Sequence, residues 1–397
     1  MQIKNTYLIL FLLLFFTSCK SSEKKDIVSI KKVTLSKKIL PGAYQTSLYI
    51  PLLKNKKVAI VGNQTSEING KHLVDTLLQL KVNITKVFSP EHGFRGTGSA
   101  GEKISNSIDN RTGLPIVSLY GKHKKPTSHD LQNVDIIFFD IQDVGVRFYT
   151  YLSTLHYVLE AAAEHHIPVV VLDRPNPNSD YIDGPIMQEK NTSFVGLHPV
   201  PIVYAMTIGE YAKMINGEKW LKNGIQAQLK IIPVKNYKHG DVYHLPVKPS
   251  PNLPNHQAVR LYPSLCLFEG TDISVGRGTD FPFQVYGSPQ LPPTDFYFIP
   301  QPNSGSKWPK HQGVKCFGKD LRNITPPTEI HLNWLIETYK AYPDKEIYFK
   351  AFFNRLAGDS NLQKMIKEGK KISEIKQSWQ KGLKKFKKIR EKYLIYQ

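Results

Sequence analysis

Short runs of β-branched and aromatic residues recur through the first half of the chain, and this repetition restricts the fold more than any other feature. The runs cover residues 57–62, 84–89, 115–120, 135–140 and 168–172. Between them, residues 72–81 and 150–165 place their apolar side chains on one helical face. Continuous apolar strands that alternate with helices are typical of a parallel sheet covered on both faces. We therefore predict an α/β fold with a Rossmann-like parallel sheet.

The second half, from about Thr192, has a different pattern. Its predicted elements are a helix at 207–221, a strand at 228–233, a Pro- and Gly-rich region at 245–309, a strand at 346–349 and Lys-rich amphipathic helices at 364–393. A loop region as long as 245–309 usually carries function or belongs to a second subdomain. We expect a Rossmann-like subdomain over residues 41–191 and a C-terminal subdomain over residues 192–397.

The N-terminus has the pattern of a signal peptide. Lys4 precedes an apolar run at 7–16, and small residues then lead to Cys19. The run is about half as long as the ~20 apolar residues that a membrane-spanning helix needs. We expect a signal peptide over 1–18, a lipidated Cys19 and a tether over 19–40, in a protein exported to the periplasm or outer membrane. A chance cysteine after an ordinary signal peptide is the alternative.

The formal charge is +20, from 53 basic and 33 acidic residues, and much of the excess lies in the C-terminal helices. An exported protein does not meet nucleic acid, so the basic face is either a solvated surface or one attracted to acidic wall polymers or lipid headgroups. After Cys19 only Cys266 and Cys316 remain. A disulfide between them is possible, but the fold cannot depend on a disulfide framework.

Polar side chains follow four of the five predicted strands. Ligands of open parallel sheets bind beyond the carboxyl ends of the strands, so these side chains are expected to meet at one edge. Turns favour Asp, Asn and Pro, but they do not require Arg, His, Gln and Tyr. The candidate site residues are Asn63, Gln64, Glu91, His92, Arg95, Asp140, Gln142, Asp143, Arg147, Tyr149, Asp173 and Arg174.

The glycines of Gly96 to Gly101 match the spacing of a dinucleotide-binding motif, but they follow a loop and no helix pattern comes after them. We therefore predict a loop over the cleft and no nucleotide cofactor. His92 could bind a metal together with nearby Asp residues, but a lone histidine beside Glu91 is more often a hydrogen-bond partner that tunes it. No metal is predicted.

The segment 268–280 concentrates three carboxylates, one arginine and three glycines. Cleavage of a glycosidic bond needs a carboxylic acid to protonate the leaving oxygen and a second group to stabilise or attack the sugar cation. Glu91 and Asp143 at the sheet edge, faced by Glu269, would supply these groups. The alternative is a structural Gly-rich turn with surface acids.

Five strings in order resemble the exo-β-N-acetylmuramidase (NamZ-type) family. They are VGNQTS at 61–66, FSPEHGFRG at 88–96, DIQDVGVRFYTY at 140–151, DRPNP at 173–177 and FEGTDISVGRG at 268–278. The resemblance runs from about Leu40 to the C-terminus. It implies a Rossmann-like subdomain, a smaller C-terminal subdomain, and a cleft between them for a non-reducing terminal N-acetylmuramic acid of peptidoglycan fragments, in cell-wall turnover or recycling.

The family's glutamate-histidine motif maps onto Glu91 and His92, and we predict that Glu91 carries the main proton transfer. The second group is Glu269, Asp143 or the acetamido oxygen of the substrate itself. The lactyl carboxylate of muramic acid would pair with arginine. The candidates for this contact are Arg95, Arg147, Arg174 and Arg277. A lipoprotein that binds the sugar without cleaving it and a metal-dependent hydrolase using His92 are the competing hypotheses.

Overall fold

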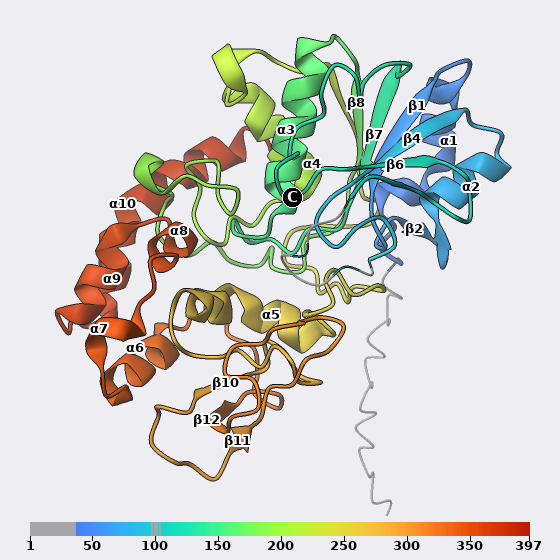
Figure 1. Ribbon diagram of the computed structural model, residues 1–397. Coiled ribbons are helices and arrows are strands. Elements are labelled where there is room, and N and C mark those ends of the chain that lie inside the picture. The colour runs from blue at the N-terminus through green and yellow to red at the C-terminus, as the bar shows by residue number, and fades with distance from the viewer. Residues whose placement is uncertain (1–36, 97, 99–101, 103–104) are drawn as a thin grey trace, which may run out of the picture. The chain divides into compact units, whose positions relative to one another are not determined.

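The computed structural model describes residues 37–96, 98, 102 and 105–397 (Figure 1). Within this part of the chain, residues 38–397 form one compact unit. The predicted signal peptide, Cys19 and the tether up to residue 36 lie outside the described residues. In the described part, no helix combines the length and the apolar character needed to cross a bilayer.

A seven-stranded sheet forms the first layer of the fold, and it confirms the predicted α/β class. Its strands are β1 (Val58–Gly62), β4 (Ile84–Ser89), β5 (Ser107–Ile108), β6 (Pro115–Ser118), β7 (Ile136–Asp140), β8 (Val169–Leu172) and β9 (Leu229–Ile232). Their order is β5-β6-β4-β1-β7-β8-β9, and only β5 is antiparallel to its neighbour. Numbered along the chain, the six parallel strands therefore run 3-2-1-4-5-6. This is the Rossmann order, in which ligands bind where the strand order reverses, between β1 and β7.

Alternate residues of each strand enter two different hydrophobic cores, because side chains of a strand point to opposite faces. In β1, Ala59 and Val61 pack on α3 (Tyr151–Glu164) and α4 (Ile208–Gly217), while Val58 and Ile60 pack on the side of α2 (Leu73–Gln79). The core on the α3 side continues into the C-terminal half of the chain. The sheet and the C-terminal half are thus joined by shared apolar packing.

The remaining elements are mostly short. Up to residue 224 they are η1 (Gly42–Tyr44), α1 (Thr46–Tyr49), η2 (Ile50–Leu53), β2 (Glu67–Ile68), β3 (Lys71–His72), η3 (Glu189–Asn191) and η4 (Lys222–Gly224). In the second half they are α5 (His256–Leu265), η5 (Cys266–Gly270), β10 (Val285–Ser288), β11 (Tyr297–Phe298), β12 (Cys316–Asp320), α6 (Leu332–Ala341), α7 (Lys345–Tyr348), α8 (Phe353–Ala357), α9 (Ser360–Lys367) and α10 (Ile372–Glu391). Strands β10, β12 and β11 form an antiparallel sheet in that order.

The structure bears on three further points of the sequence analysis. The strand predicted at 346–349 is wrong: the segment forms helix α7, whose first turn is capped by the Asp344 side chain accepting from the Glu346 amide. The change of subdomain expected at residue 192 stays a prediction; beyond that residue, α4 packs on the large sheet and β9 pairs with β8. Cys266 and Cys316 are both buried free thiols, so no disulfide joins them.

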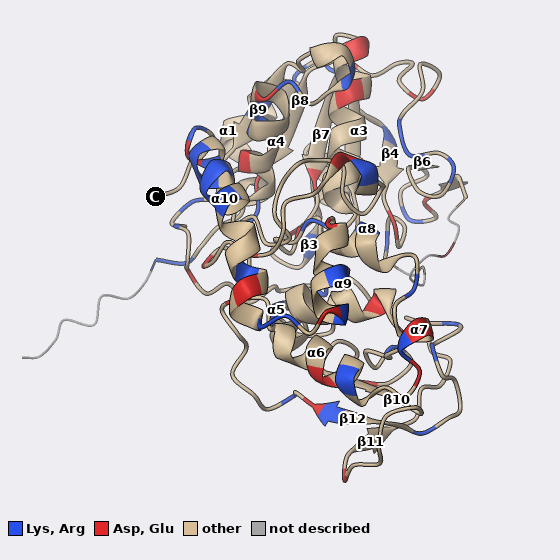
Figure 2. Cartoon of the chain, turned by 90° about the vertical axis from the view of Figure 1, so that its left-hand side faces the viewer, with Lys and Arg blue, Asp and Glu red and all other residues tan. Residues whose placement is uncertain are grey.

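The C-terminal helix α10 is amphipathic, as predicted. Ile375, Trp379, Leu383 and Phe386 are buried, and lysines gather on its outer face (Figure 2). After this helix, Tyr396 returns to the large sheet. Its hydroxyl donates to a carboxylate oxygen of Asp173 at 2.6 Å, just beyond β8. The end of the chain thus completes the carboxyl edge of the sheet.

Arg147, in the loop after β7, joins that loop to the C-terminal half. Its side chain is 2% exposed and donates to four backbone carbonyls: those of Pro185 at 2.9 Å, Val200 at 2.7 Å, Leu356 at 3.0 Å and Ala357 at 2.6 Å. Burial lowers the pKa of Arg147 to about 9. Gly358, at φ 72°, lies so close that a Cβ there would meet the guanidinium at 2.4 Å.

We expect Arg147→Met to lower the free energy of unfolding by at least about 3 kcal/mol, because it leaves buried carbonyls without a donor. Urea unfolding of the parent and the variant would measure this loss. Arg355→Met, at an exposed position of α8, is the matched control and should change stability little. Equal unfolding midpoints for the two variants would show that the four bonds do not contribute as described.

Candidate active site

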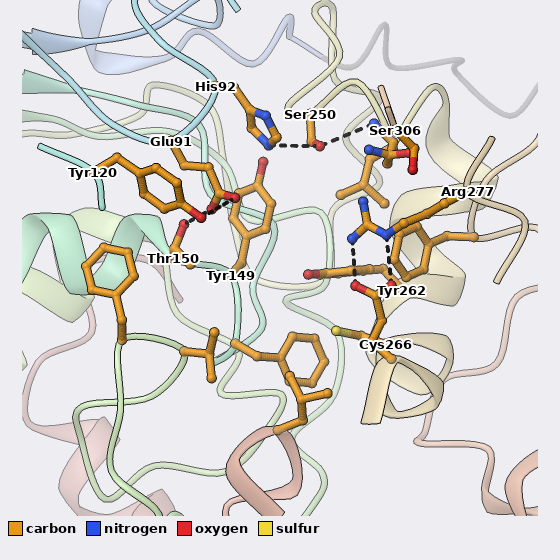
Figure 3. Close-up of a pocket in the computed structure, with 18 of the residues that line it drawn as sticks. Glu91, His92, Tyr120, Tyr149, Thr150, Ser250, Tyr262, Cys266, Arg277 and Ser306 are labelled. Carbon is orange, nitrogen blue, oxygen red and sulfur yellow. Dashed lines mark hydrogen bonds and ion pairs between the residues drawn. The ribbon is translucent and has the colours of Figure 1, made fainter. Parts of the chain in front are cut away.

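A pocket of about 630 Å³ lies at the carboxyl edge of the large sheet, a volume typical of small-molecule sites (Figure 3). One part of its lining comes from loops after β4, β6 and β7, and another from α5, η5, α8 and the loops around them. The predicted site residues in the lining are Glu91, His92, Tyr149, Glu269 and Arg277. The structure therefore brings together residues that are up to 186 positions apart in the sequence.

Glu91, two residues after β4, is half-buried and accepts hydrogen bonds from two hydroxyl groups. Tyr120 donates to Oε1 at 2.9 Å and Thr150 donates to Oε2 at 2.9 Å. Thr150 immediately precedes α3, so the carboxylate also lies near the positive end of a helix. In Figure 3 these three side chains point toward one another.

His92 is buried and both of its ring nitrogens are occupied. Nδ1 lies 2.9 Å from the Gly98 carbonyl oxygen, which can only accept, so Nδ1 carries the proton. Nε2 then accepts from the Ser250 hydroxyl at 3.3 Å. Burial lowers the pKa of His92, although the charge of Glu91 opposes this shift. The imidazole is therefore neutral at neutral pH and fixes two loops of the pocket.

Glu269 and Arg277 form a bidentate ion pair. Arg277 donates through Nε at 2.8 Å and through a terminal nitrogen at 2.6 Å. Burial by itself would raise the pKa of Glu269, but the charge and hydrogen bonds of Arg277 outweigh it and lower the pKa. Two left-handed glycines, Gly276 and Gly278, flank the arginine, and a Cβ at Gly278 would meet the Gln301 carbonyl oxygen at 2.5 Å. The Gly-rich sequence thus serves to place Arg277.

Tyr149 lines the pocket between the part that carries Glu91 and the part that carries Arg277 (Figure 3). Its hydroxyl donates to the Pro249 carbonyl at 2.7 Å, and its ring packs edge-on against Tyr262, another lining residue, at 6.1 Å. Because the hydroxyl is already committed to the backbone, Tyr149 offers the pocket an aromatic surface.

The other predicted residues support the pocket from beneath and do not line it. The Asn63 amide donates to the Tyr151 hydroxyl at 2.9 Å, and Gln64 donates to the Lys248 and Pro249 carbonyls at 3.2 and 3.1 Å. Gln142 donates to the carbonyls of Asp143 and Pro175. These amides hold the strand-end loops in place.

Three of the four arginines predicted to meet the substrate carboxylate have other partners. Arg174 pairs with Asp140 at 2.6 Å in the interior, and Arg95 pairs with Asp109 at 2.7 Å outside this pocket. Arg147 holds the four carbonyls described above. Only Arg277 lines the pocket.

The buried carboxylates behind the sheet edge also have structural partners. Asp173 accepts from Thr207 at 2.7 Å, and burial raises its pKa to about 6. Asp143 is 3% exposed, and its Oδ2 accepts from the Gly145 amide at 2.7 Å and from the Tyr204 hydroxyl. Burial raises the pKa of Asp143 to about 6 as well. Asp143, predicted as a catalytic carboxylate, is not among the lining residues.

Sequence reasoning missed several lining residues. Tyr120 ends the third predicted strand, 115–120, and Lys124 follows it; this strand end was the one left out of the predicted edge. A full count of strand ends would have found them. Ser250 and Trp308 come from the Pro- and Gly-rich region, where no periodic signal marks them.

Among the described residues, no group of three or more His, Cys, Asp and Glu side chains is arranged to hold a metal ion. The loop predicted over the cleft at 96–101 cannot be placed, because residues 97 and 99–101 lie outside the description. Of that segment, Gly98 contributes the carbonyl bound by His92.

Two family models match the chain. Residues 58–257 match the N-terminal part, and residues 260–396 the C-terminal part, of the exo-β-N-acetylmuramidase NamZ. The chain is 38% identical over 410 residues to the peptidoglycan β-N-acetylmuramidase NamZ of Bacillus subtilis strain 168, and the match covers 97% of each chain.

Crystal structures of two DUF1343 family proteins from Bacteroides fragilis NCTC 9343 have a similar fold. One is 44% identical, with a TM-score of 0.85 over 91% of this chain and 99% of that one. The other is 26% identical, with a TM-score of 0.77 over 90% and 99%.

We expect Asp143→Asn to stay active and to alter the pH dependence of stability. The folded-state pKa of about 6 exceeds the unfolded value of about 3.9, so this group's stabilising contribution is fully present below pH ~4 and is lost as the pH rises through 6. The parent should therefore lose roughly 2–3 kcal/mol between pH 4 and 7.5 that the variant keeps. Urea unfolding of the parent and the variant at several pH values measures this difference. The pKa of Asp173 is raised as well, but Asp173 is present in both proteins, so its contribution drops out of the comparison.

Turnover of the Asp143→Asn protein provides the second readout. A folded variant with strongly reduced turnover would return Asp143 to the catalytic group.

Proposed function

The chain belongs to the exo-β-N-acetylmuramidase NamZ family, and from this premise we propose which residues of the pocket carry out the reaction. The protein is a glycoside hydrolase that releases N-acetylmuramic acid from the ends of peptidoglycan glycan fragments. Of the two competing hypotheses from the sequence, family membership sets aside the binding lipoprotein without catalysis. Nothing in the geometry around His92 favours the metal-dependent hydrolase, since both ring nitrogens are hydrogen-bonded within the protein.

The observation that carries the proposal is the position of Glu91 in the pocket between two hydroxyl donors. In the reaction, the bond between the anomeric carbon and the glycosidic oxygen breaks, and a protonated Glu91 gives its proton to that oxygen. The hydroxyls of Tyr120 and Thr150 then stabilise the carboxylate that this transfer leaves behind. Water supplies the new oxygen at the anomeric carbon, and its proton returns to Glu91.

Glu269 is suited to the second role because Arg277 keeps it charged. A carboxylate whose pKa is lowered is a poor proton donor, but it stabilises the positive charge that develops on the sugar ring. The attacking atom at the anomeric carbon is then either the acetamido oxygen of the substrate or water. A substrate with its acetamido group replaced by hydroxyl distinguishes these two routes, since only the first requires that oxygen.

His92 acts as a positioning residue in this scheme. It connects the Gly98 and Ser250 segments beside Glu91, which itself accepts from Tyr120 and Thr150. Loss of the imidazole would therefore loosen the loop that carries Glu91. Its buried, neutral state suits this role.

We further propose that the protein is exported and held at the periplasmic or outer membrane surface by a lipid on Cys19. Support comes from the sequence, where the apolar run 7–16 leads to Cys19 through two small residues. The peptidoglycan substrate is found in the same compartment. The anchor and the active site would then act together at the cell wall.

We expect Glu91→Gln to lower kcat by about 10²–10⁴-fold on a chromogenic N-acetylmuraminide, because general acid–base assistance is of this size. Circular dichroism and urea unfolding would check that the fold is kept. Glu164→Gln, at an exposed α3 carboxylate that pairs with Lys125, is the matched control and should turn over like the parent. Near-parental turnover by Glu91→Gln would refute the central assignment.

We expect the parent protein in the membrane fraction of the cell and Cys19→Ala outside it, because the variant lacks the thiol that would carry the lipid. Fractionation followed by immunoblotting measures the distribution. Cys316→Ala, which removes a buried thiol instead, should remain with the membrane. If Cys19→Ala fractionates like the parent, the anchor is not at this residue.

A further inference from the structure

Four charged side chains line the pocket, and one cation among them is not neutralised by an ion pair. They are Glu91, Glu269, Arg277 and Lys124. The guanidinium of Arg277 uses Nε and one terminal nitrogen in its ion pair with Glu269, so these two charges offset each other. Among the residues that the structure describes, Lys124 is in no ion pair with Asp or Glu.

Lys124 lies in the loop after β6, in the same loop as Tyr120. Its ammonium nitrogen is held 4.7 Å from the centre of the Phe194 ring. The Phe194 ring lies 6.2 Å from the ring of Tyr120, whose hydroxyl donates to Glu91. Lys124 therefore belongs to the Glu91 side of the pocket. The neighbouring Lys125 differs, because it is bound to Glu160 at 2.7 Å.

The contact with Phe194 fixes the lysine without removing its charge. A ring face attracts an ammonium group through its quadrupole, and it accepts none of the three N–H donors in the way that a carboxylate does. Lys124 thus presents a preorganised cation to the pocket. Such a group is suited to a ligand with a single carboxylate.

N-acetylmuramic acid carries such a carboxylate, on the lactyl ether that distinguishes it from N-acetylglucosamine. We propose that Lys124 binds this lactyl carboxylate and thereby selects N-acetylmuramic acid. The inference rests on the proposed function, and it replaces the arginines that the sequence suggested for this contact. Three of those have other partners, and Arg277 is offset by Glu269.

The test compares two ligands with the parent and Lys124→Met. The ligands are free N-acetylmuramic acid and the same sugar with its lactyl carboxylate converted to the neutral carboxamide, both measured by calorimetry. A hydrogen bond between charged groups predicts that Lys124→Met weakens binding of the acid by about 10–100-fold and leaves binding of the amide nearly unchanged. Lys124→Arg, which keeps a cation, should retain more of the preference for the acid.

Lys122→Met is the matched control, since Lys122 is an exposed lysine of the same loop outside the lining. It should bind both ligands like the parent. The proposal is overturned if the parent binds acid and amide equally, if Lys124→Met weakens both ligands equally, or if Lys122→Met reproduces its effect. Binding of the free sugar needs no catalysis, so hydrolysis of the chromogenic N-acetylmuraminide tests the proposed function separately.

Discussion

A guanidinium buried without a carboxylate costs free energy unless its donors are satisfied. In Arg147 the two terminal nitrogens donate to four backbone carbonyls, and only the buried Nε has no partner among the described residues. The next three residues, 148–150, line the pocket, and so does Leu356, one of the acceptors. The same side chain therefore ties the loop after β7 to helix α8, two separate parts of the pocket lining. The positions of Thr150 and of its acceptor Glu91 depend on this connection.

The sequence predicted the large sheet well because its strands are buried on both faces. Runs such as that of β7, Ile136–Asp140, are apolar throughout and bounded by polar turns, so local composition was sufficient. The C-terminal half was harder. The α7 segment reads as a strand by composition, but the Asp344 cap and tertiary packing make it a helix. Strand β9 was recognised, yet its pairing with β8 across 56 residues of intervening chain is not visible in local sequence.

The site was predicted in part, for a physical reason. Strand-end topology correctly brought Glu91, His92 and Tyr149 toward one edge, and the Gly-rich segment supplied Glu269 and Arg277. Sequence does not show which charges are already neutralised. Arg174 pairs with Asp140, 34 positions away, and Arg95 pairs with Asp109, 14 positions away. Only the fold shows that the charges of these arginines are already neutralised by a carboxylate of the protein.

The bond from Tyr396 to Asp173 joins residues 223 positions apart, and Tyr396 is the penultimate residue of the chain. Asp173 also accepts from the Thr207 hydroxyl and the Gly209 amide, so Tyr396 adds the most distant of several bonds to a buried carboxylate. Native contacts this distant in sequence form late, because the loop between them must close first. The carboxyl edge of β8 is therefore expected to reach its final set of hydrogen bonds only after the more local parts of the sheet have folded.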